Sequence, residues 1–281
     1  NKVVTKINCL NKNQINSIEM YDKINSVKQT VKADYVFLCT SPVETVKILL
    51  NSKSKIYKKG LGNNYNMVGK KFNDHISVNY VGILNILKKV NFDISPYHPS
   101  KKLDNFYLLI SEKKIKSYLK FIVHGSISIK NKLISLYSFS ESDTKNKNYI
   151  CLSKKKDIYG NHEVKVKFQW SKREKDIWNI QKKIINKIVK IFSKSLQTSI
   201  SQKKNDYKNF ITIPTPGRSY HESGGVVMGY NKLNSVVDKN CKVWGIKNLY
   251  VCNMSVFPSL SPFNPTLTSL AITDKVTDSL K

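Results

Sequence analysis

The chain has 281 residues, long enough for one large hydrophobic core or two smaller ones. A hydrophobic fraction of 40% excludes a disordered chain, and no run of about 18 apolar residues indicates a transmembrane helix. The formal net charge of +29 suggests a polyanionic partner, yet only Arg173 and Arg218 are arginines among 48 basic residues. Because arginine makes most bidentate contacts to phosphates and bases, we expect no nucleic-acid partner.

The chain begins Asn1-Lys2-Val3 and leads at once into a strand-like segment, so we expect it to be cut from a longer protein. Residues 3–9 and 33–39 are predicted strands, the second fully buried because of its apolar continuity. Pro42 opens a predicted helix that continues to Leu50. This order of strand, turn and helix is typical of a doubly wound α/β layer.

The middle of the chain is predicted to be an antiparallel sheet followed by one long helix. Turn clusters separate its apolar runs. The runs are 76–84, 106–110, 121–127, 133–139, 149–152 and 164–170. Residues 172–196 then carry isoleucines at helical spacing, from Ile177 to Ile191, opposite a lysine-rich face that we interpret as solvated.

The C-terminal segment combines groups that can take a proton and stabilise negative charge. His221 lies close to Gly224 and Gly225, and histidine is the usual side chain for accepting a hydroxyl proton near neutral pH. A buried strand is predicted at 248–252. Asn264 as N-cap and Pro265 as first helical residue then predict a terminal helix. The N-terminus of a helix favours developing negative charge.

Segments at both ends of the chain resemble the glucose–methanol–choline (GMC) oxidoreductase family, and the resemblance is weak in the middle. At the C-terminal end the matching segments are His221–Gly229, Val236–Asp238 with Val243–Val251, Ser255–Pro258 and Asn264–Thr268. At the N-terminal end they are Ala33–Leu50 with its Glu-Thr and Leu-Leu-Asn-Ser motifs, Gly60–Asn63, and Val68–His75.

The resemblance implies FAD as cofactor and transfer of a hydride from an alcohol carbon to flavin N5. It implies that His221 is the catalytic base and that Asn264 hydrogen-bonds the substrate oxygen. Residues implied to contact the cofactor are Asn253, Met254, Pro265, Thr266 and, through an adenine contact, Val4; Met254 has simple loop packing as its alternative. The family's Ala-Ala-Gly is Cys39-Thr40-Ser41 here, and no GxGxxG phosphate-binding motif is present, so the chain is expected to be about half of the enzyme.

The expected fold class is α/β plus α+β: part of a doubly wound FAD-binding layer made by both chain ends, with an inserted antiparallel-sheet substrate domain. The expected boundaries are 1–75 and 214–281 for the FAD-binding parts and 76–213 for the substrate domain. Five scattered cysteines at no metal-ligand spacing predict free thiols in a reducing, cytoplasmic compartment and no metal site. We interpret His75, with Asp74, as architectural, and His98, His124 and His162 as surface or sheet residues.

The function hypothesis is oxidation of a sugar or polyol hydroxyl, because the Gly-Gly turn and Asn264 resemble bacterial sugar-oxidising members. The electron acceptor is either oxygen or a quinone or other carrier. Two alternatives remain open. One is a non-catalytic basic binding protein, and the other is a subunit that pairs with a separate flavin-binding chain and exposes an apolar patch along 33–50.

Overall fold

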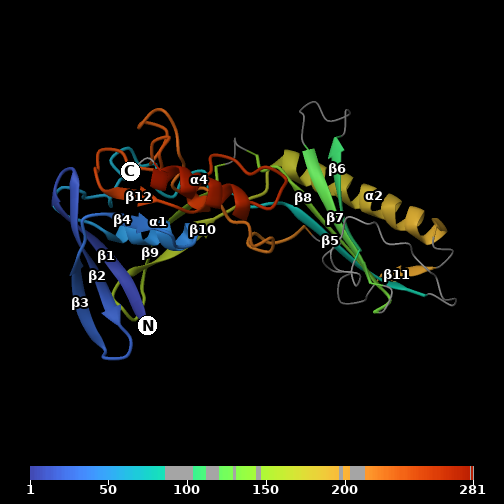
Figure 1. Cartoon of the computed structure of the whole chain (residues 1–281), viewed down its shortest axis with the longest axis horizontal. Helices are drawn as coiled ribbons and strands as arrows, with labels where there is room; N and C mark the ends of the chain where they lie inside the picture. The colour runs from blue at the N-terminus through green and yellow to red at the C-terminus, as the bar shows by residue number, and fades with distance from the viewer. Residues whose placement is uncertain are drawn as a thin grey trace.

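The computed structural model describes residues 1–85, 104–111, 120–128, 131–143, 147–195, 199–202, 213–278 and 280. Figure 1 shows two lobes arranged along the longest axis of the molecule. The first lobe contains both ends of the chain, and the second contains a five-stranded sheet and a long helix. The mixed α/β class with antiparallel sheets is therefore confirmed. His98 lies outside the described residues.

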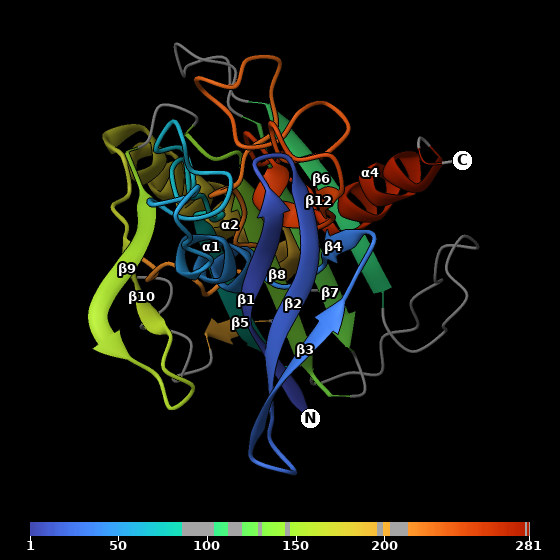
Figure 2. The ribbon, with the colours of Figure 1, turned by 90° about the vertical axis from the view of Figure 1, so that its left-hand side faces the viewer.

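A three-stranded antiparallel sheet forms one face of the first lobe (Figure 2). Its strands are β1 (Lys2–Asn11), β2 (Gln14–Asp22) and β3 (Val27–Lys32). Ile7 and Ile15 are almost fully buried, whereas most of β3 is exposed. The sheet therefore covers the first core along β1 and β2 and leaves β3 at the edge.

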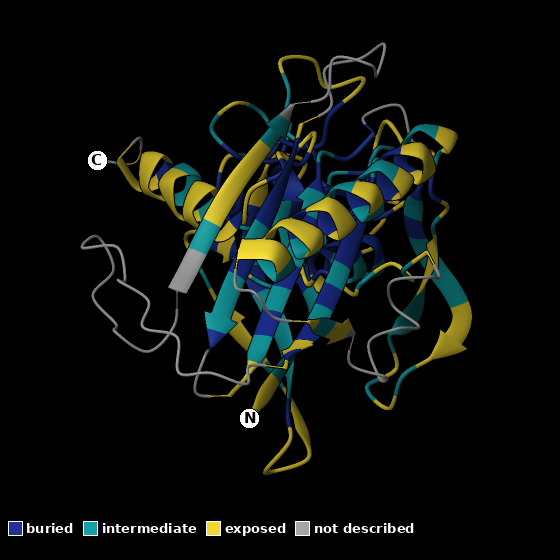
Figure 3. Cartoon of the chain, turned by 90° about the vertical axis from the view of Figure 1, so that its right-hand side faces the viewer, coloured by how far each residue is buried: buried dark blue, intermediate teal, exposed yellow. Residues whose placement is uncertain are grey.

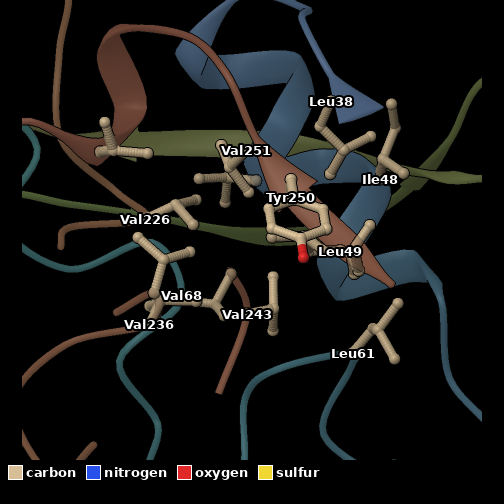
Figure 4. Close-up of a cluster of buried hydrophobic side chains, with 14 of the residues drawn as sticks. Leu38, Ile48, Leu49, Leu61, Val68, Val226, Val236, Val243, Tyr250 and Val251 are labelled. Atoms are coloured by element: carbon tan, nitrogen blue, oxygen red, sulfur yellow. The ribbon is translucent and has the colours of Figure 1, made fainter. Parts of the chain in front are cut away.

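A short parallel sheet at the centre of the first lobe joins the two chain ends. β4 (Val36–Leu38) pairs with β12 (Leu249–Val251), and the helix α1 (Pro42–Asn51) follows β4 directly. The N-cap Ser41 accepts a hydrogen bond from the backbone N–H of Glu44, and Pro42 occupies the first turn, as predicted. Figure 4 shows aliphatic side chains from α1 and both strands packed together in this core.

The prediction that residues 33–39 form a fully buried strand was wrong. Tyr35 is 57% exposed and Phe37 is 40% exposed, while Val36 and Leu38 are buried. The ring of Phe37 stacks on Tyr250 with centroids 5.4 Å apart. This sheet has two strands in the described part of the chain, and the side chains of β4 alternate between buried and exposed, whereas all three residues of β12 are buried.

The prediction of a single antiparallel sheet across the middle of the chain also needs correction. β9 (Tyr149–Lys156) and β10 (His162–Lys167) form a separate two-stranded sheet that packs against α1. The reason is that Ile150, Leu152 and Val164 belong to the first core. The domain boundaries 1–75, 76–213 and 214–281 stay predictions.

The second lobe is an antiparallel sheet in the order β11-β5-β8-β7-β6. Its strands are β5 (Ser77–Leu84), β6 (Asp104–Ser111), β7 (Lys120–Ser128), β8 (Leu133–Ser140) and β11 (Ile200–Gln202). The predicted long helix is α2 (Lys172–Ser195), which lies across this sheet with its outward face exposed (Figure 3). Trp178 and Ile185 are buried against the sheet and Ile177 is also buried, although Ile191 at the end of the stripe is 55% exposed.

The last segment forms the 3-10 helix η1 (Met254–Val256) and the helix α4 (Thr266–Asp278). The first hydrogen bond at the start of α4 runs from the N–H of Ser269 to the carbonyl of Pro265. Pro265 is therefore the N-cap residue, and Asn264 lies just before the cap. The helix begins one residue later than predicted. Within the described part of the chain, no helix combines the length and the apolar character needed to cross a membrane.

Candidate active site

The turn that carries His221 packs against residues 71–75, immediately before β5. Asn73 and Ser223 exchange two backbone hydrogen bonds of 2.8 and 2.9 Å. Gly224 follows with a φ of +73°, and a Cβ atom there would lie 2.0 Å from the carbonyl oxygen of Lys71. The close approach of the two backbones therefore requires glycine at this position.

Asp74 fixes the backbone on the N-terminal side of His221. Its Oδ2 accepts a hydrogen bond of 2.6 Å from the N–H of Gly217, and its Oδ1 accepts one from the Ser219 hydroxyl. The Ser219 oxygen in turn accepts a bond of 3.3 Å from the N–H of His221. Burial raises the pKa of the Asp74 carboxyl to about 6, and the donors from Ser219, Gly217 and His75 oppose this shift without cancelling it.

The imidazole of His75 contacts the imidazole of His221 directly. Their Nδ1 atoms are 3.0 Å apart, and the two rings are nearly perpendicular. On its other side, Nε2 of His75 lies 2.7 Å from the carbonyl oxygen of Ser261. The ring of Phe139, at the end of β8, packs on both histidines with centroids 5.6 and 5.1 Å away.

The two histidines differ in their burial and therefore in their protonation. His75 is 1% exposed, and desolvation, with a smaller contribution from the neighbouring His221, lowers its pKa to about 4. His221 is half-buried, and desolvation lowers its pKa from the usual 6.5. Both imidazoles are therefore neutral at pH 7, which is the state that a base requires.

Asn253 and Met254 also lie beside this turn. The carbonyl of Met254 accepts a 3.1 Å hydrogen bond from the N–H of Gly224. The side chain of Asn253 points inward: its Nδ2 donates to the carbonyl of Leu38 and to the Thr45 hydroxyl at 2.8 and 2.9 Å. Both donors of this amide thus join η1 to β4 and α1, and its Oδ1 accepts a 2.8 Å hydrogen bond from the N–H of Ser255 as the N-cap of η1.

The other predicted site residues lie at the start of α4 and on β1. Asn264 and Thr266 are exposed at the start of α4, and Pro265 between them is buried. Asn264 follows Ser261 by three residues, so His75 links the His221 turn to the loop that presents Asn264. Val4 lies on β1, where it pairs with Met20.

Sequence reasoning assigned His75 an architectural role and did not anticipate its contact with His221. The Asp-His pair at 74 and 75 was visible as a motif, but 146 residues separate the two histidines. Only the packing of residues 71–75 against the turn reveals that Asp74 holds the backbone of the turn while His75 holds the imidazole ring.

A small polar pocket lies next to this turn. It has a volume of about 160 Å³ and is lined by Ser77, Asn79, Pro214, Arg218 and Tyr220, the residue before His221. The buried Oδ1 atom of Asn79 has no hydrogen-bond partner among the described residues. A ligand with hydroxyl groups could satisfy such an acceptor, because buried polar atoms are normally hydrogen-bonded.

Comparison with known proteins indicates the family that the chain resembles. Residues 144–273 match the family model described as GMC oxidoreductase. The resemblance to the GMC oxidoreductase family is confirmed. Segments of the chain are also similar to two curated proteins: a dehydrogenase from Armillaria gallica, 35% identical over 65 residues, and the dehydrogenase pkfF from Emericella nidulans, 36% identical over 63 residues. These matches cover 23% and 22% of this chain and 10% of each relative.

The fold is similar to that of a GMC oxidoreductase of known structure, pyridoxine 4-oxidase from Mesorbium loti. The TM-score is 0.63 at 15% sequence identity, and the match covers 99% of this chain. It covers 57% of the pyridoxine 4-oxidase chain, so the present chain spans little more than half of that structure. The match extends the similarity in fold beyond residues 144–273, to the segment that carries His75.

Proposed function

We propose that the chain is the substrate-activating part of a flavin-dependent alcohol oxidoreductase, in which His221 accepts the hydroxyl proton. The observation that carries the proposal is the half-buried, neutral imidazole of His221, held on its Nδ1 side by His75 and on its backbone side by Ser219. An imidazole so fixed has one ring nitrogen, Nε2, left for a substrate. A positioned base of this kind contributes about 10²–10⁴-fold to the rate of a proton transfer.

The described residues divide the proposed reaction into separate tasks. His221 takes the proton from the substrate hydroxyl, which weakens the adjacent C–H bond as negative charge develops on oxygen. Asn264 donates a hydrogen bond to that oxygen through its side-chain amide. Asp74, Ser219 and Gly224 hold the turn so that the imidazole does not move away during the transfer.

The start of α4 fits the ring system of a flavin, and a bound flavin would supply the hydride acceptor. Leu267 and Leu270 are 78% and 61% exposed and share a face of the helix, next to the polar Asn264 and Thr266. The first-turn N–H groups of a helix also favour negative charge. No GxGxxG motif occurs among the 281 residues, so we propose that the pyrophosphate is held by a segment outside this chain.

The open face of β4 is consistent with such a further segment. Tyr35 and Phe37 expose aromatic surface on a sheet that has only two strands in the described chain. Isolated parallel pairs are rare, because parallel sheets are usually covered on both faces. A continuation of the same polypeptide and a separate flavin-binding subunit both fit this surface.

A sugar or polyol is the proposed substrate class. The 160 Å³ pocket beside Tyr220 is lined largely by polar side chains. Among them are the guanidinium of Arg218, which can donate hydrogen bonds, and Asn79, whose buried Oδ1 can accept one. Such a lining suits a molecule with several hydroxyl groups better than an aliphatic alcohol. We propose oxygen or a quinone-type carrier as the final electron acceptor.

The test uses the complete protein and a panel of sugars and polyols. Stopped-flow absorbance measures the rate at which each compound reduces the flavin in the absence of oxygen. His221→Ala is expected to slow reduction by about 10²–10⁴-fold. His124→Ala is the matched control, because His124 lies on β7 and stacks on Tyr107. Unchanged reduction by His221→Ala would remove this residue from the mechanism.

The alternative function is binding of a polyanion without catalysis. One concavity of about 800 Å³ is lined by Lys147, Lys167, Lys172 and Lys175 among other residues. Clustered lysines raise the local concentration of anions, and the resulting binding weakens steeply with salt. A complete protein that holds no flavin but retains salt-sensitive heparin binding would favour this alternative.

A further inference from the structure

The hydrogen-bond chain from Ser261 through His75 to His221 fixes where the protons lie. The carbonyl oxygen of Ser261 can only accept, so Nε2 of His75, 2.7 Å away, must carry a proton. A neutral imidazole has one N–H, so Nδ1 of His75 is then a bare acceptor. The Nδ1 atom of His221, 3.0 Å from it, must therefore be the donor.

We propose that His75 is a positioning residue that selects the Nδ1–H tautomer of His221 and thereby leaves its Nε2 atom free as the proton acceptor. The inference deepens the function proposed above and rests on it for the identity of the base. In this arrangement Nε2–H of His75 donates to the Ser261 carbonyl, and Nδ1–H of His221 donates to Nδ1 of His75. The Nε2 atom of His221 then carries no proton.

The surroundings keep His75 in the form that this role requires. Its side chain is 1% exposed, Phe139 covers the ring, and its backbone N–H donates to Asp74 at 2.8 Å. A protonated His75 would place two N–H groups against each other across the 3.0 Å contact with His221. The charged groups that bear on this pair are Asp74, which touches the backbone of His75, and Glu222, which acts on Asp74.

The same arrangement accommodates the product of the proton transfer. When Nε2 of His221 takes the substrate proton, the imidazolium carries N–H groups at both nitrogens. Its Nδ1–H continues to donate to His75, so no hydrogen bond has to be exchanged during the step. This is the work that an acidic residue does in other histidine-based catalytic sites, performed here by a neutral histidine polarised by a backbone carbonyl.

The direct test is long-range ¹H–¹⁵N correlation spectroscopy of the complete protein labelled at histidine nitrogens. Five histidines are present, so single variants assign the signals. At pH 7.5 we expect His221 to show a protonated Nδ1 and a bare Nε2, and His75 the reverse. An Nε2–H tautomer of His221 in the unmodified protein overturns the proposal without reference to any variant.

His75→Gln separates positioning from packing. The glutamine amide can keep the donor toward Ser261 but places no acceptor at the former Nδ1 position, so the Nε2–H tautomer of His221 should become dominant or mixed. The matched control is His124→Gln, a half-buried histidine on β7. In turnover, His75→Gln should lower kcat by about 10- to 100-fold with KM changed by less than about twofold, whereas His124→Gln should change neither.

The outcomes distinguish this inference from the proposed function. A wild-type protein that oxidises no alcohol but shows the expected tautomers refutes the function and leaves the hydrogen-bond order standing. A protein that oxidises alcohols while His75→Gln keeps the Nδ1–H tautomer on His221, or keeps its full kcat, refutes the positioning role alone.

Discussion

Asp74 and His75 are adjacent buried residues whose protonation should act on stability in opposite directions as pH changes. The pKa of His75 is about 4 in the folded chain against 6.5 for an unperturbed histidine. Between these values the unfolded chain binds the extra proton, so the free energy of unfolding rises with pH. The pKa of Asp74 is about 6 against 3.8, so between these values the folded chain binds the extra proton and the free energy of unfolding falls with pH.

The two contributions are similar in size, because each pKa shift corresponds to roughly 3 kcal/mol when one unit is worth about 1.4 kcal/mol. They should nearly cancel in the unmodified chain between pH 4 and 6. His75→Gln removes the rising contribution, so its loss of stability relative to wild type should grow by roughly 3 kcal/mol from pH 4 to pH 6.5. Asp74→Asn should show the opposite trend, its deficit shrinking as pH rises.

The assay is urea unfolding of the three proteins at half-unit steps from pH 4 to pH 7. Differences between proteins at one pH cancel the contributions of titratable groups that do not interact with the substituted residue. Each variant also loses hydrogen bonds at every pH, which adds a constant offset and leaves the slope readable. Parallel stability curves for all three proteins would refute the reasoning, since they would mean that neither group titrates differently on folding.

Three further outcomes follow from the described geometry. If His221 is the base, as proposed, the kcat/KM of the complete protein should rise with pH to a plateau, with an apparent pKa below 6.5, because desolvation lowers the pKa of His221. The pH profile of anaerobic flavin reduction measures this. Gly224→Ala should cost at least about 3 kcal/mol by thermal unfolding, because its Cβ meets Lys71, whereas Gly160→Ala, also at positive φ but with open space, should cost about 1 kcal/mol. Ile185→Ala should cost about 2–5 kcal/mol in the same assay, because its side chain is fully buried between α2 and the sheet.

Elements with local signals were predicted from the sequence. α1 was recognised by Pro42 in its first turn, and α2 by isoleucines at helical spacing, and both helices start at the expected residue. These signals lie within one or two turns of the chain, so no knowledge of distant partners was needed. The buried strand at β12 was found for the same reason.

The sequence did not predict which distant segments pack against each other. β9 and β10 have the same strand-like composition as β7 and β8, yet they pack on α1 because Ile150 and Val164 find their apolar neighbours there. The exposure of Phe37 likewise depends on how many strands flank β4, which its own residues do not specify. At the candidate site, His221 was selected from its Gly-rich turn and family resemblance, whereas the role of His75 required the fold.

The pairing of β4 with β12 also constrains the order in which this polypeptide can acquire structure during synthesis. The backbone N–H of Ile15 donates a hydrogen bond to the side chain of Asn248, 233 residues later in the chain. Val36 pairs with Leu249, which is also distant in the sequence. Closing a loop of this length costs about 2 kcal/mol more chain entropy than closing one of roughly 20 residues. The hairpin of β7 and β8 needs only its immediate neighbours, so the second lobe should gain protection first. The first lobe should therefore keep part of its apolar surface exposed until the residues of β12 have been synthesised.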